Sequence, residues 1–287
     1  MPLATNVKAV LKANKLAAHK TLGQNFLVHR HTAERIVDLA GVAPTDTIIE
    51  LGVGLGALTV PLAARAAKVI GLEIDAGIIK WHQENGELPA NVTLIHQDIL
   101  RADFAELASQ CGGTIKIVSN LPYSISNPLL FKLLENRHLM TSAVLMLQKE
   151  VAQRLNARVG TKEYGPLTVL LNGYAAVANL MQVGPGQFHP RPKVDSTVVK
   201  ILFQPPTTRA VQLPTHDFNL LRALVNGAFG QRRKTLLNAL SASALFANRK
   251  SEVRELLAKA DLDPAIRAER LSVEDYVRLA NLASQAT

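Results

Sequence analysis

The sequence predicts a doubly wound α/β sheet followed by a smaller, entirely helical domain. Three observations support this fold class. Short apolar runs alternate with helical periodicity from about residue 46 to 147, prolines then interrupt the chain near residue 206, and only helical patterns follow. Parallel strands that helices cover on both faces read as continuous apolar runs, which is the pattern found here. The predicted strands are Ile48–Leu51, Val69–Ile74, Val92–His96, Ile115–Val118 and Ala143–Leu147.

A helix is expected before this sheet and one more strand after it. In HTAERIVDLAGV (residues 31–42) apolar residues recur at helical spacing, with Thr32 as the candidate N-cap and Gly41 at the stop. The apolar run Val198–Phe203 predicts the late strand.

A proline-rich stretch marks the expected domain boundary. QPPTTRAVQLP (residues 204–214) has three prolines and no periodicity. We therefore expect residues 1–207 to form the sheet domain, with a basic N-terminal segment, and residues 208–287 to form the helical domain. The helices expected there are Phe218–Phe229, Lys234–Phe246, Glu252–Ala260 and a last one from Ser272, whose Ser-Val-Glu-Asp opening is a capping box with Asp275 in the glutamate position.

Composition limits where the chain acts and what it binds. A net charge of +9 favours a polyanionic partner, because basic side chains that neutralise phosphates release counterions; a merely soluble basic surface is the alternative. Cys111 is the only cysteine, which excludes an intrachain disulfide, and His29 and His31 lack companions for a metal site, so no metal is expected. No apolar run approaches the roughly 18 residues of a membrane span, and the lysine-rich start does not resemble a secretory signal. We expect a cytoplasmic protein with no membrane partner.

Glycines follow the first predicted strand in ELGVGLGALT. Gly52, Gly54 and Gly56 precede a helix expected from about Ala57, where glycine lets the backbone turn tightly and approach a ligand. A dinucleotide loop usually reads G-x-G-x-x-G, whereas the third glycine here comes one residue early, and no Gly-Lys-Ser or Gly-Lys-Thr phosphate loop is present. The loop therefore favours S-adenosyl-L-methionine, which has no phosphates, while NAD stays possible.

Acidic residues end the next two predicted strands. Glu73 follows the loop by about 20 residues, where a carboxylate can accept both hydroxyls of a ribose. Asp98 comes after the third strand, where a carboxylate could accept a hydrogen bond from an adenine amino group. Either acid alone could be a helix cap or a solvated charge. Together with the glycines they indicate a nucleoside pocket at the carboxyl edge of the sheet.

The motif Asn-Leu-Pro-Tyr ends the fourth predicted strand. Asn120 offers a side-chain carbonyl, and the rigid Leu121-Pro122 backbone can hold a main-chain carbonyl in a fixed orientation. Two such acceptors would orient an exocyclic amino group for attack on a sulfonium methyl, and orientation can supply most of the rate. Tyr123 would stack on the ring that carries the amino group, a contact worth roughly 1–3 kcal/mol. A proline turn with a packed tyrosine is the structural alternative.

Taken with LGQNFL (22–27), FHPRPKVDS (188–196) and AFGQRRKTLLNAL (228–240), these motifs resemble the ribosomal RNA adenine N6,N6-dimethyltransferases, most closely the bacterial small-subunit enzymes. The resemblance runs from about residue 19 to the carboxyl end. It implies a Rossmann-like S-adenosylmethionine-dependent methyltransferase sheet. It also implies transfer of two methyls to each of two adjacent adenosines in the 3′-terminal hairpin of small-subunit rRNA, with a role in ribosome biogenesis. One departure is visible, since Val53 replaces the family's usual proline in the glycine loop.

The resemblance also implies roles for particular residues. Phe188 would stack on the second face of a flipped base, opposite Tyr123, and Asn120 would bridge cofactor and target. The implied catalytic residues are Asn120, Leu121, Pro122, Tyr123 and Phe188. The implied cofactor contacts are Gln24, Asn25, Leu27, Gly52, Gly54, Glu73, Asp98 and Asn120.

Basic residues near the carboxyl end are expected to contact RNA. Arg232, Arg233 and Lys234 lie at a predicted helix junction, where phosphate contact is favoured over a solvated charged face once RNA is the target. Basic residues near the other end support this expectation, namely Lys8, Lys12, Lys15, Lys20 and Arg30. The expected partner is small-subunit rRNA within the immature 30S particle, bound by a monomeric protein.

Two other functions stay open from the sequence. One is a 23S rRNA adenine dimethyltransferase of the macrolide-resistance type, which shares the Asn-Leu-Pro-Tyr motif. The other is a non-catalytic RNA-binding assembly factor that has kept the fold.

Overall fold

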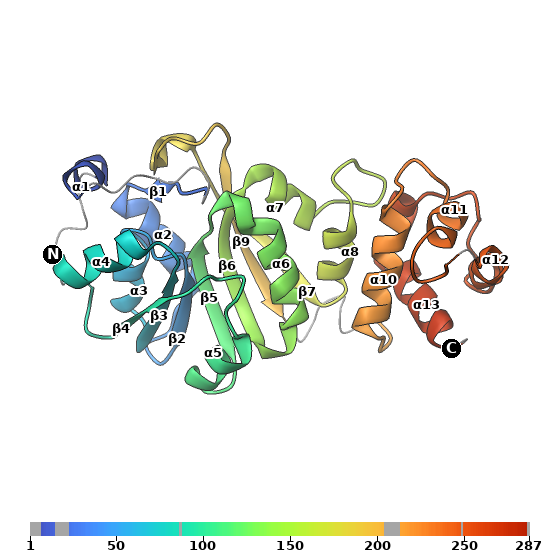
Figure 1. Ribbon diagram of the computed structural model, residues 1–287, viewed down its shortest axis with the longest axis horizontal. Coiled ribbons are helices and arrows are strands. Elements are labelled where there is room, and N and C mark those ends of the chain that lie inside the picture. The colour runs from blue at the N-terminus through green and yellow to red at the C-terminus, as the bar shows by residue number, and fades with distance from the viewer. Residues whose placement is uncertain (1–6, 15–22, 86–87, 204–212, 248, 286–287) are drawn as a thin grey trace. The chain divides into compact units, whose positions relative to one another are not determined.

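The computed structural model describes residues 7–14, 23–85, 88–203, 213–247 and 249–285 (Figure 1). By contacts between residues the chain divides into two units. The first is Met1–Ala152 with Ala178–Phe203, and the second is Gln153–Val177 with Gln204–Thr287. This division differs from the expected domains in that Gln153–Val177 groups with the helical part. The expected boundary between residues 207 and 208 lies outside the described residues.

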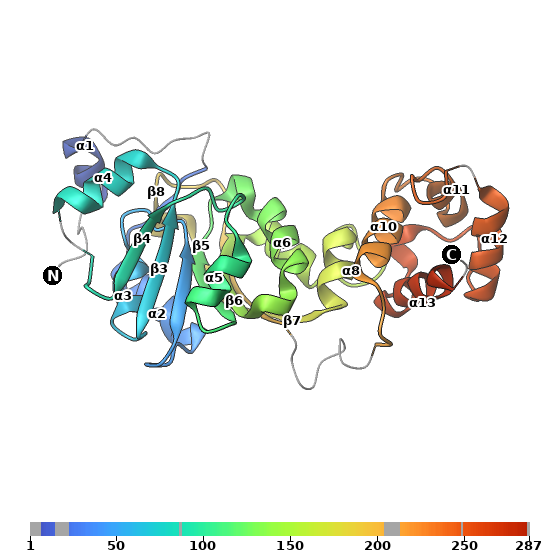
Figure 2. The same cartoon turned by 60° about the horizontal axis from the view of Figure 1, so that its bottom comes forward.

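A seven-stranded sheet forms the core of the first unit, with helices on both of its faces (Figure 2). The strand order is β4-β3-β2-β5-β6-β9-β7. The pairs from β4 to β6 are parallel, and β9 runs antiparallel to β6. Because the chain winds outward in one direction from β2 and then in the other from β5, the predicted doubly wound α/β fold is confirmed. The strands are β2 (Thr47–Leu51), β3 (Lys68–Glu73), β4 (Val92–His96), β5 (Ile115–Asn120), β6 (Met140–Gln148), β7 (Ala175–Val183) and β9 (Ser196–Phe203).

The apolar runs form central strands because helices bury both of their faces. Ile48 of β2 packs in a core cluster with Ile36 of α2 and Leu62 of α3, while its neighbour Ile49 is equally buried on the other face. The helices of this unit are α1 (Val7–Ala13), α2 (Arg30–Ala40), α3 (Thr59–Ala63), α4 (Ala76–Asn85), α5 (Phe104–Gln110) and α6 (Ser126–Glu135). Among the described residues no helix has the length and apolar character needed to cross a membrane.

A two-stranded sheet joins the segment before α2 to the segment before β9. β1 (Phe26–Leu27) pairs antiparallel with β8 (Phe188–His189), with Leu27 opposite Phe188. The prediction that Thr32 caps α2 is wrong, because the helix starts at Arg30 after an extended His29. The hydroxyl of Thr32 instead donates to Gln187 Oε1 at 2.7 Å, beside the paired strands. The predicted stop is confirmed, since Gly41 adopts a left-handed φ of 69°.

One strand of the sheet was not predicted. β7 has the sequence AAVANLMQV and lies at the edge of the sheet, with several of its residues exposed. Asn179 and Gln182 interrupt its apolar residues, so it lacks the continuous apolar run by which the other strands of the sheet were identified. The predicted late strand is confirmed as β9, which starts two residues earlier than expected, at Ser196.

The second unit consists of short helices packed around α10. α10 contacts α8, α11 and α13, and its bounds, Phe218–Phe229, match the prediction. The capping box is confirmed, since the Ser272 hydroxyl accepts from Asp275 N at 3.1 Å while the Asp275 carboxylate accepts from Ser272 N at 2.8 Å. The helix predicted over Lys234–Phe246 is shorter, because turns occupy both of its ends. The remaining helices of this unit are α8 (Pro166–Asn172), α11 (Leu236–Ser241), α12 (Lys250–Lys259) and α13 (Val273–Ser284). The division between the two units falls within α7 (Lys149–Leu155).

Candidate active site

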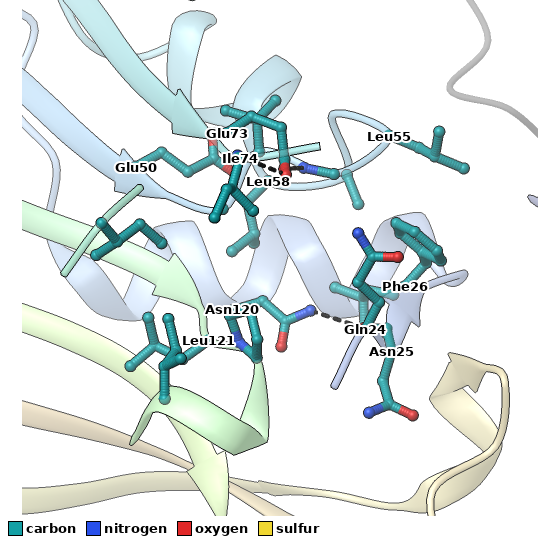
Figure 3. A pocket seen from close by; sticks show the side chains of 18 of the residues that line it. Gln24, Asn25, Phe26, Glu50, Leu55, Leu58, Glu73, Ile74, Asn120 and Leu121 are labelled. Carbon is teal, nitrogen blue, oxygen red and sulfur yellow. Dashed lines mark hydrogen bonds between the residues drawn. The ribbon is translucent and has the colours of Figure 1, made fainter. Parts of the chain in front are cut away.

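A cavity of about 230 Å³ opens at the carboxyl ends of the parallel strands in the first unit (Figure 3). Open α/β sheets bind ligands at this edge, where the strand order reverses. Every residue that the resemblance assigned to the cofactor lines this cavity, together with Leu121 and Pro122. The assigned residues are Gln24, Asn25, Leu27, Gly52, Gly54, Glu73, Asp98 and Asn120.

The cavity is lined by acidic side chains and by no described lysine or arginine. The three acidic side chains are those of Glu50, Glu73 and Asp98. A cavity with this lining attracts a cationic ligand and disfavours a phosphorylated one. Among the described residues no cluster of histidine, cysteine and carboxylate side chains could hold a metal ion.

The glycine loop is held through both backbone polar groups of Gly54. Gly54 N donates to Glu73 Oε2 at 2.9 Å, and the Gly54 carbonyl oxygen accepts from His82 Nε2 at 2.8 Å. Gly54 has a φ of 54°, and a Cβ on it would lie 3.2 Å from the ring of Phe26. Glycine is required here both for the backbone conformation and for the approach of the segment that carries β1.

Val53, the departure from the family's proline, packs against a glycine of the next strand. A Cβ on Gly71 of β3 would lie 2.4 Å from Val53 Cγ2. The valine therefore occupies the space that a side chain at position 71 would need. Residues 53 and 71 are a matched pair, and Val53 removes no polar group from the cavity.

Glu73 is the last residue of β3, and three backbone N–H groups donate to its carboxylate. Its Oε1 accepts from the backbone N–H groups of Ile74 and Asp75 at 2.9 Å each, and its Oε2 accepts from Gly54. Burial raises the pKa of Glu73, and these backbone donors oppose that shift. Gln24 lies on the other side of the cavity rim, where its Nε2 donates to Asp75 Oδ2 at 3.2 Å.

Glu50 is a cavity residue that the sequence reasoning missed. It is 1% exposed in the middle of β2, and its Oε2 has no hydrogen-bond partner among the described residues. Burial raises the pKa of Glu50 to about 8; the Thr59 hydroxyl opposes the shift and the neighbouring Glu73 carboxylate adds to it. A charged residue inside an apolar strand was the signal that could have revealed it, because such a residue is rarely buried without a ligand or partner.

Asp98 and Asn120 face the cavity from the ends of β4 and β5. Asp98 Oδ1 accepts from Leu100 N at 2.9 Å, which fixes the carboxylate at the rim. Asn120 Nδ2 donates to the Asn25 carbonyl at 3.1 Å, a contact that Figure 3 shows across the rim. The amide nitrogen of Asn120 is thus engaged by the β1 segment, and its side-chain oxygen is left to act as the acceptor.

The two predicted stacking rings lie outside the cavity lining. Tyr123 starts a 3-10 turn (Tyr123–Ile125) two residues after β5 ends, and its hydroxyl lies 2.6 Å from Ser196 Oγ. Phe188 is 4% exposed and packs in the core cluster with Leu27. Tyr123 therefore lies between Pro122 and Ser124, which both line the cavity, whereas Phe188 lies in the core opposite Leu27 of β1.

The predicted RNA-binding residues belong to the second unit. Arg232, Arg233 and Lys234 are exposed in the turn after α10. Arg232 Nη2 also donates to the carbonyls of Lys162 at 3.1 Å and Tyr164 at 3.4 Å, so it holds the loop before α8. Of the N-terminal basic residues, Lys8 and Arg30 are exposed. Lys15, Lys20 and the side chain of Lys12 lie outside the described residues.

Comparison with known proteins shows which family the chain resembles. The family model for ribosomal RNA adenine dimethylase matches residues 15–285. "Ribosomal RNA small subunit methyltransferase A" of Desulfotalea psychrophila is 50% identical over 282 residues, which are 96% of this chain and 94% of the relative. The protein of the same name from Geobacter metallireducens is 41% identical over 270 residues, which are 94% and 96% of the two chains.

Solved structures show the same architecture. The crystal structure of a dimethyladenosine transferase from Plasmodium falciparum has a TM-score of 0.73 at 27% identity and covers 91% of this chain and 98% of its own. The crystal structure of the 23S rRNA methyltransferase ErmE has a TM-score of 0.63 at 25% identity and covers 91% and 100% of the two chains.

Proposed function

The chain belongs to the ribosomal RNA adenine dimethylase family, and from this premise we propose how the first unit holds the cofactor and orients the target. The protein is an S-adenosylmethionine-dependent rRNA adenine dimethyltransferase. The substrate we propose is a pair of adjacent adenosines in the 3′-terminal hairpin of small-subunit rRNA. We further propose that the enzyme acts as a monomer on the immature 30S particle in the cytoplasm, as a step of small-subunit biogenesis.

The acidic cavity is the single observation that supports this cofactor best. S-adenosylmethionine carries a sulfonium and an ammonium group and has no phosphate. A lining with three acidic side chains, of which Glu50 stays largely protonated below about pH 8, and no described basic residue suits this cation, whereas the pyrophosphate of NAD would be repelled. The cofactor supplies the methyl group as an electrophile.

The residues around the cavity would each hold a different part of the cofactor. We assign Glu73 to the ribose hydroxyls, because its carboxylate lines the cavity and retains acceptor capacity beyond its backbone contacts. Asp98 would accept from the adenine amino group. Gln24, Asn25 and Leu27 would close the cavity from the β1 side.

The rim residues would orient the target nitrogen. The Asn120 side-chain oxygen is one acceptor for the adenine amino group. The Pro122 carbonyl already accepts from Ile125 N at 3.2 Å and from the Ser126 hydroxyl at 3.4 Å, so we assign the second acceptor to the Leu121 carbonyl. Two acceptors on one amino group hold its nitrogen toward the methyl and favour localisation of its lone pair. No strong base is required, since orientation supplies the rate.

The base would be held by stacking once it has left the RNA helix. Tyr123 lies at the rim beside Asn120 and is partly exposed, so its ring can receive a base in this conformation. Phe188 is buried, so β8 would have to move for it to reach the opposite face. We therefore assign Tyr123 to the first contact with the base and Phe188 only to the RNA-bound state.

Two observations favour the small-subunit substrate over the alternatives. Relatives with 40–50% identity share the small-subunit name, whereas the 23S enzyme is similar at 25% identity. A non-catalytic assembly factor would not need the complete set of cofactor residues that line the cavity.

Incorporation of methyl groups from labelled S-adenosylmethionine tests the proposal. We expect incorporation into immature small subunits, with the label at two adjacent adenosines, and none into naked 23S rRNA. Label in the 23S rRNA alone would support the macrolide-resistance type. RNA binding without incorporation would support the assembly factor.

A further inference from the structure

A hydrogen bond joins the catalytic motif to a strand that no assignment above involves. The Tyr123 hydroxyl lies 2.6 Å from Ser196 Oγ, although the two residues are 73 positions apart in the sequence. Ser196 is 0% exposed and is the first residue of β9. A serine this buried needs a partner for its hydroxyl, and its described partner is the tyrosine.

The backbone around Ser196 is fixed on both sides. Ser196 is opposite Gln148 in the antiparallel ladder of β6 and β9. The preceding residue, Asp195, accepts from Lys149 N at 3.0 Å through its carbonyl, and its carboxylate lies 3.6 Å from Lys149 Nζ. The Ser196 hydroxyl is therefore a rigid anchor rather than a side chain that follows the ring.

The ring of Tyr123 would otherwise be poorly constrained. It stands on a short 3-10 turn at the rim and is only partly buried. A tyrosine ring without a bond at its hydroxyl can tilt about its two side-chain torsions. A bond at the far end of the ring fixes that tilt, and with it the plane on which a base can stack.

We propose that Ser196 is a positioning residue for methyl transfer, which fixes the ring of Tyr123 and so sets the height and tilt of the target adenine relative to Asn120. This inference rests on the proposed stacking role of Tyr123. The hydroxyl pair acts by geometry and not as a proton acceptor, since burial raises the pKa of Tyr123 and the phenol stays protonated at neutral pH.

A double-mutant cycle tests this role in the full-length protein. The variants are Ser196→Ala, Tyr123→Phe and their combination, because each change removes the hydrogen bond and keeps the ring. Tyr123→Ala removes the ring itself. Ser241→Ala is the matched control, since it deletes another buried hydroxyl, whose bond among the described residues is to the Leu237 carbonyl in the second unit.

The readouts are kcat and KM for methyl transfer to immature small subunits, the Kd of S-adenosylmethionine and the Tm. We expect Ser196→Ala and Tyr123→Phe each to lower kcat by about fivefold, as loss of one hydrogen bond would. The combination should be no worse than either change alone. KM and the cofactor Kd should stay near wild type, and Ser241→Ala should leave kcat unchanged. Tyr123→Phe should lower the Tm modestly, because it leaves the buried Ser196 hydroxyl without its described partner.

Several results would overturn the inference. If both single variants keep the wild-type kcat while Tyr123→Ala loses activity, the stacking role of Tyr123 is supported and the positioning role of Ser196 is wrong. If the two losses multiply to about 25-fold, the hydroxyls act independently of one another. If Ser196→Ala weakens cofactor binding or lowers the Tm and Tyr123→Phe does not, Ser196 is structural. If Tyr123→Ala is fully active, the stacking role itself fails.

Discussion

Replacing Glu50 by glutamine should remove a large pH dependence from the stability of the first unit. The carboxyl group is buried beneath the cofactor cavity, and its pKa rises from the ordinary 4.5 to about 8. Between these two values the folded protein holds a proton that the unfolded chain has released. Folding therefore becomes less favourable as the pH rises across this interval.

The size of this effect follows from the interval. At about 1.4 kcal/mol per pH unit, the rise from 4.5 to about 8 gives about 5 kcal/mol, which is an upper figure. The contribution of Glu50 to stability is intact below pH 4.5 and is lost as the pH passes about 8. Glu50→Gln cannot ionise, so the variant should gain stability over wild type as the pH increases.

Urea unfolding followed by tryptophan fluorescence measures this difference. Trp81 is the only tryptophan and is buried in α4, so its emission reports on the first unit. The free energy of unfolding of wild type minus that of Glu50→Gln should fall steadily between pH 5 and pH 8, while other titrating groups cancel. A difference that stays flat across this range would refute the reasoning about Glu50.

Two further predictions concern Gly71 in β3 and Arg233 in the turn after α10. Gly71→Ala should destabilise the first unit by about 1–3 kcal/mol, because its Cβ would meet Val53, and Val53→Ala in the same chain should restore most of the loss in urea unfolding; a Gly71→Ala variant as stable as wild type would contradict the packing. Arg233→Ala should weaken binding to small-subunit rRNA and reduce the slope of log Kd against log salt concentration by about 1. Lys250→Ala, which changes another exposed basic residue, is the control. An unchanged slope for Arg233→Ala would exclude phosphate contact by Arg233.

Features set by local pattern could be predicted from the sequence. The central strands were found because burial on both faces demands continuous apolar residues, and the capping box at Ser272 was found because its partners lie three residues apart. Glu73, Asp98 and Asn120 were found because each stands at or just after the end of a predicted parallel strand. The edge strand β7 was missed because Asn179 and Gln182 interrupt its apolar residues.

Features set by contacts distant in sequence could not be predicted. Thr32 looked like a cap, but its hydroxyl is used by Gln187, which the pairing of β1 and β8 brings close. The match of Val53 to Gly71 depends on adjacent strands. The bond between Tyr123 and Ser196 depends on β9 returning beside β6. The sequence around each of these residues does not indicate which distant residue it contacts.

Comparison of Asn120→Ala with Glu73→Ala tests the central claim most directly. Cofactor Kd is measured by calorimetry, and single-turnover methyl transfer at saturating S-adenosylmethionine is measured on immature small subunits. If the cavity holds the cofactor and the rim orients the adenine amino group, Asn120→Ala lowers transfer by at least about 100-fold with a small change in Kd, whereas Glu73→Ala chiefly raises Kd. Equal losses of binding and transfer in both variants would contradict that division.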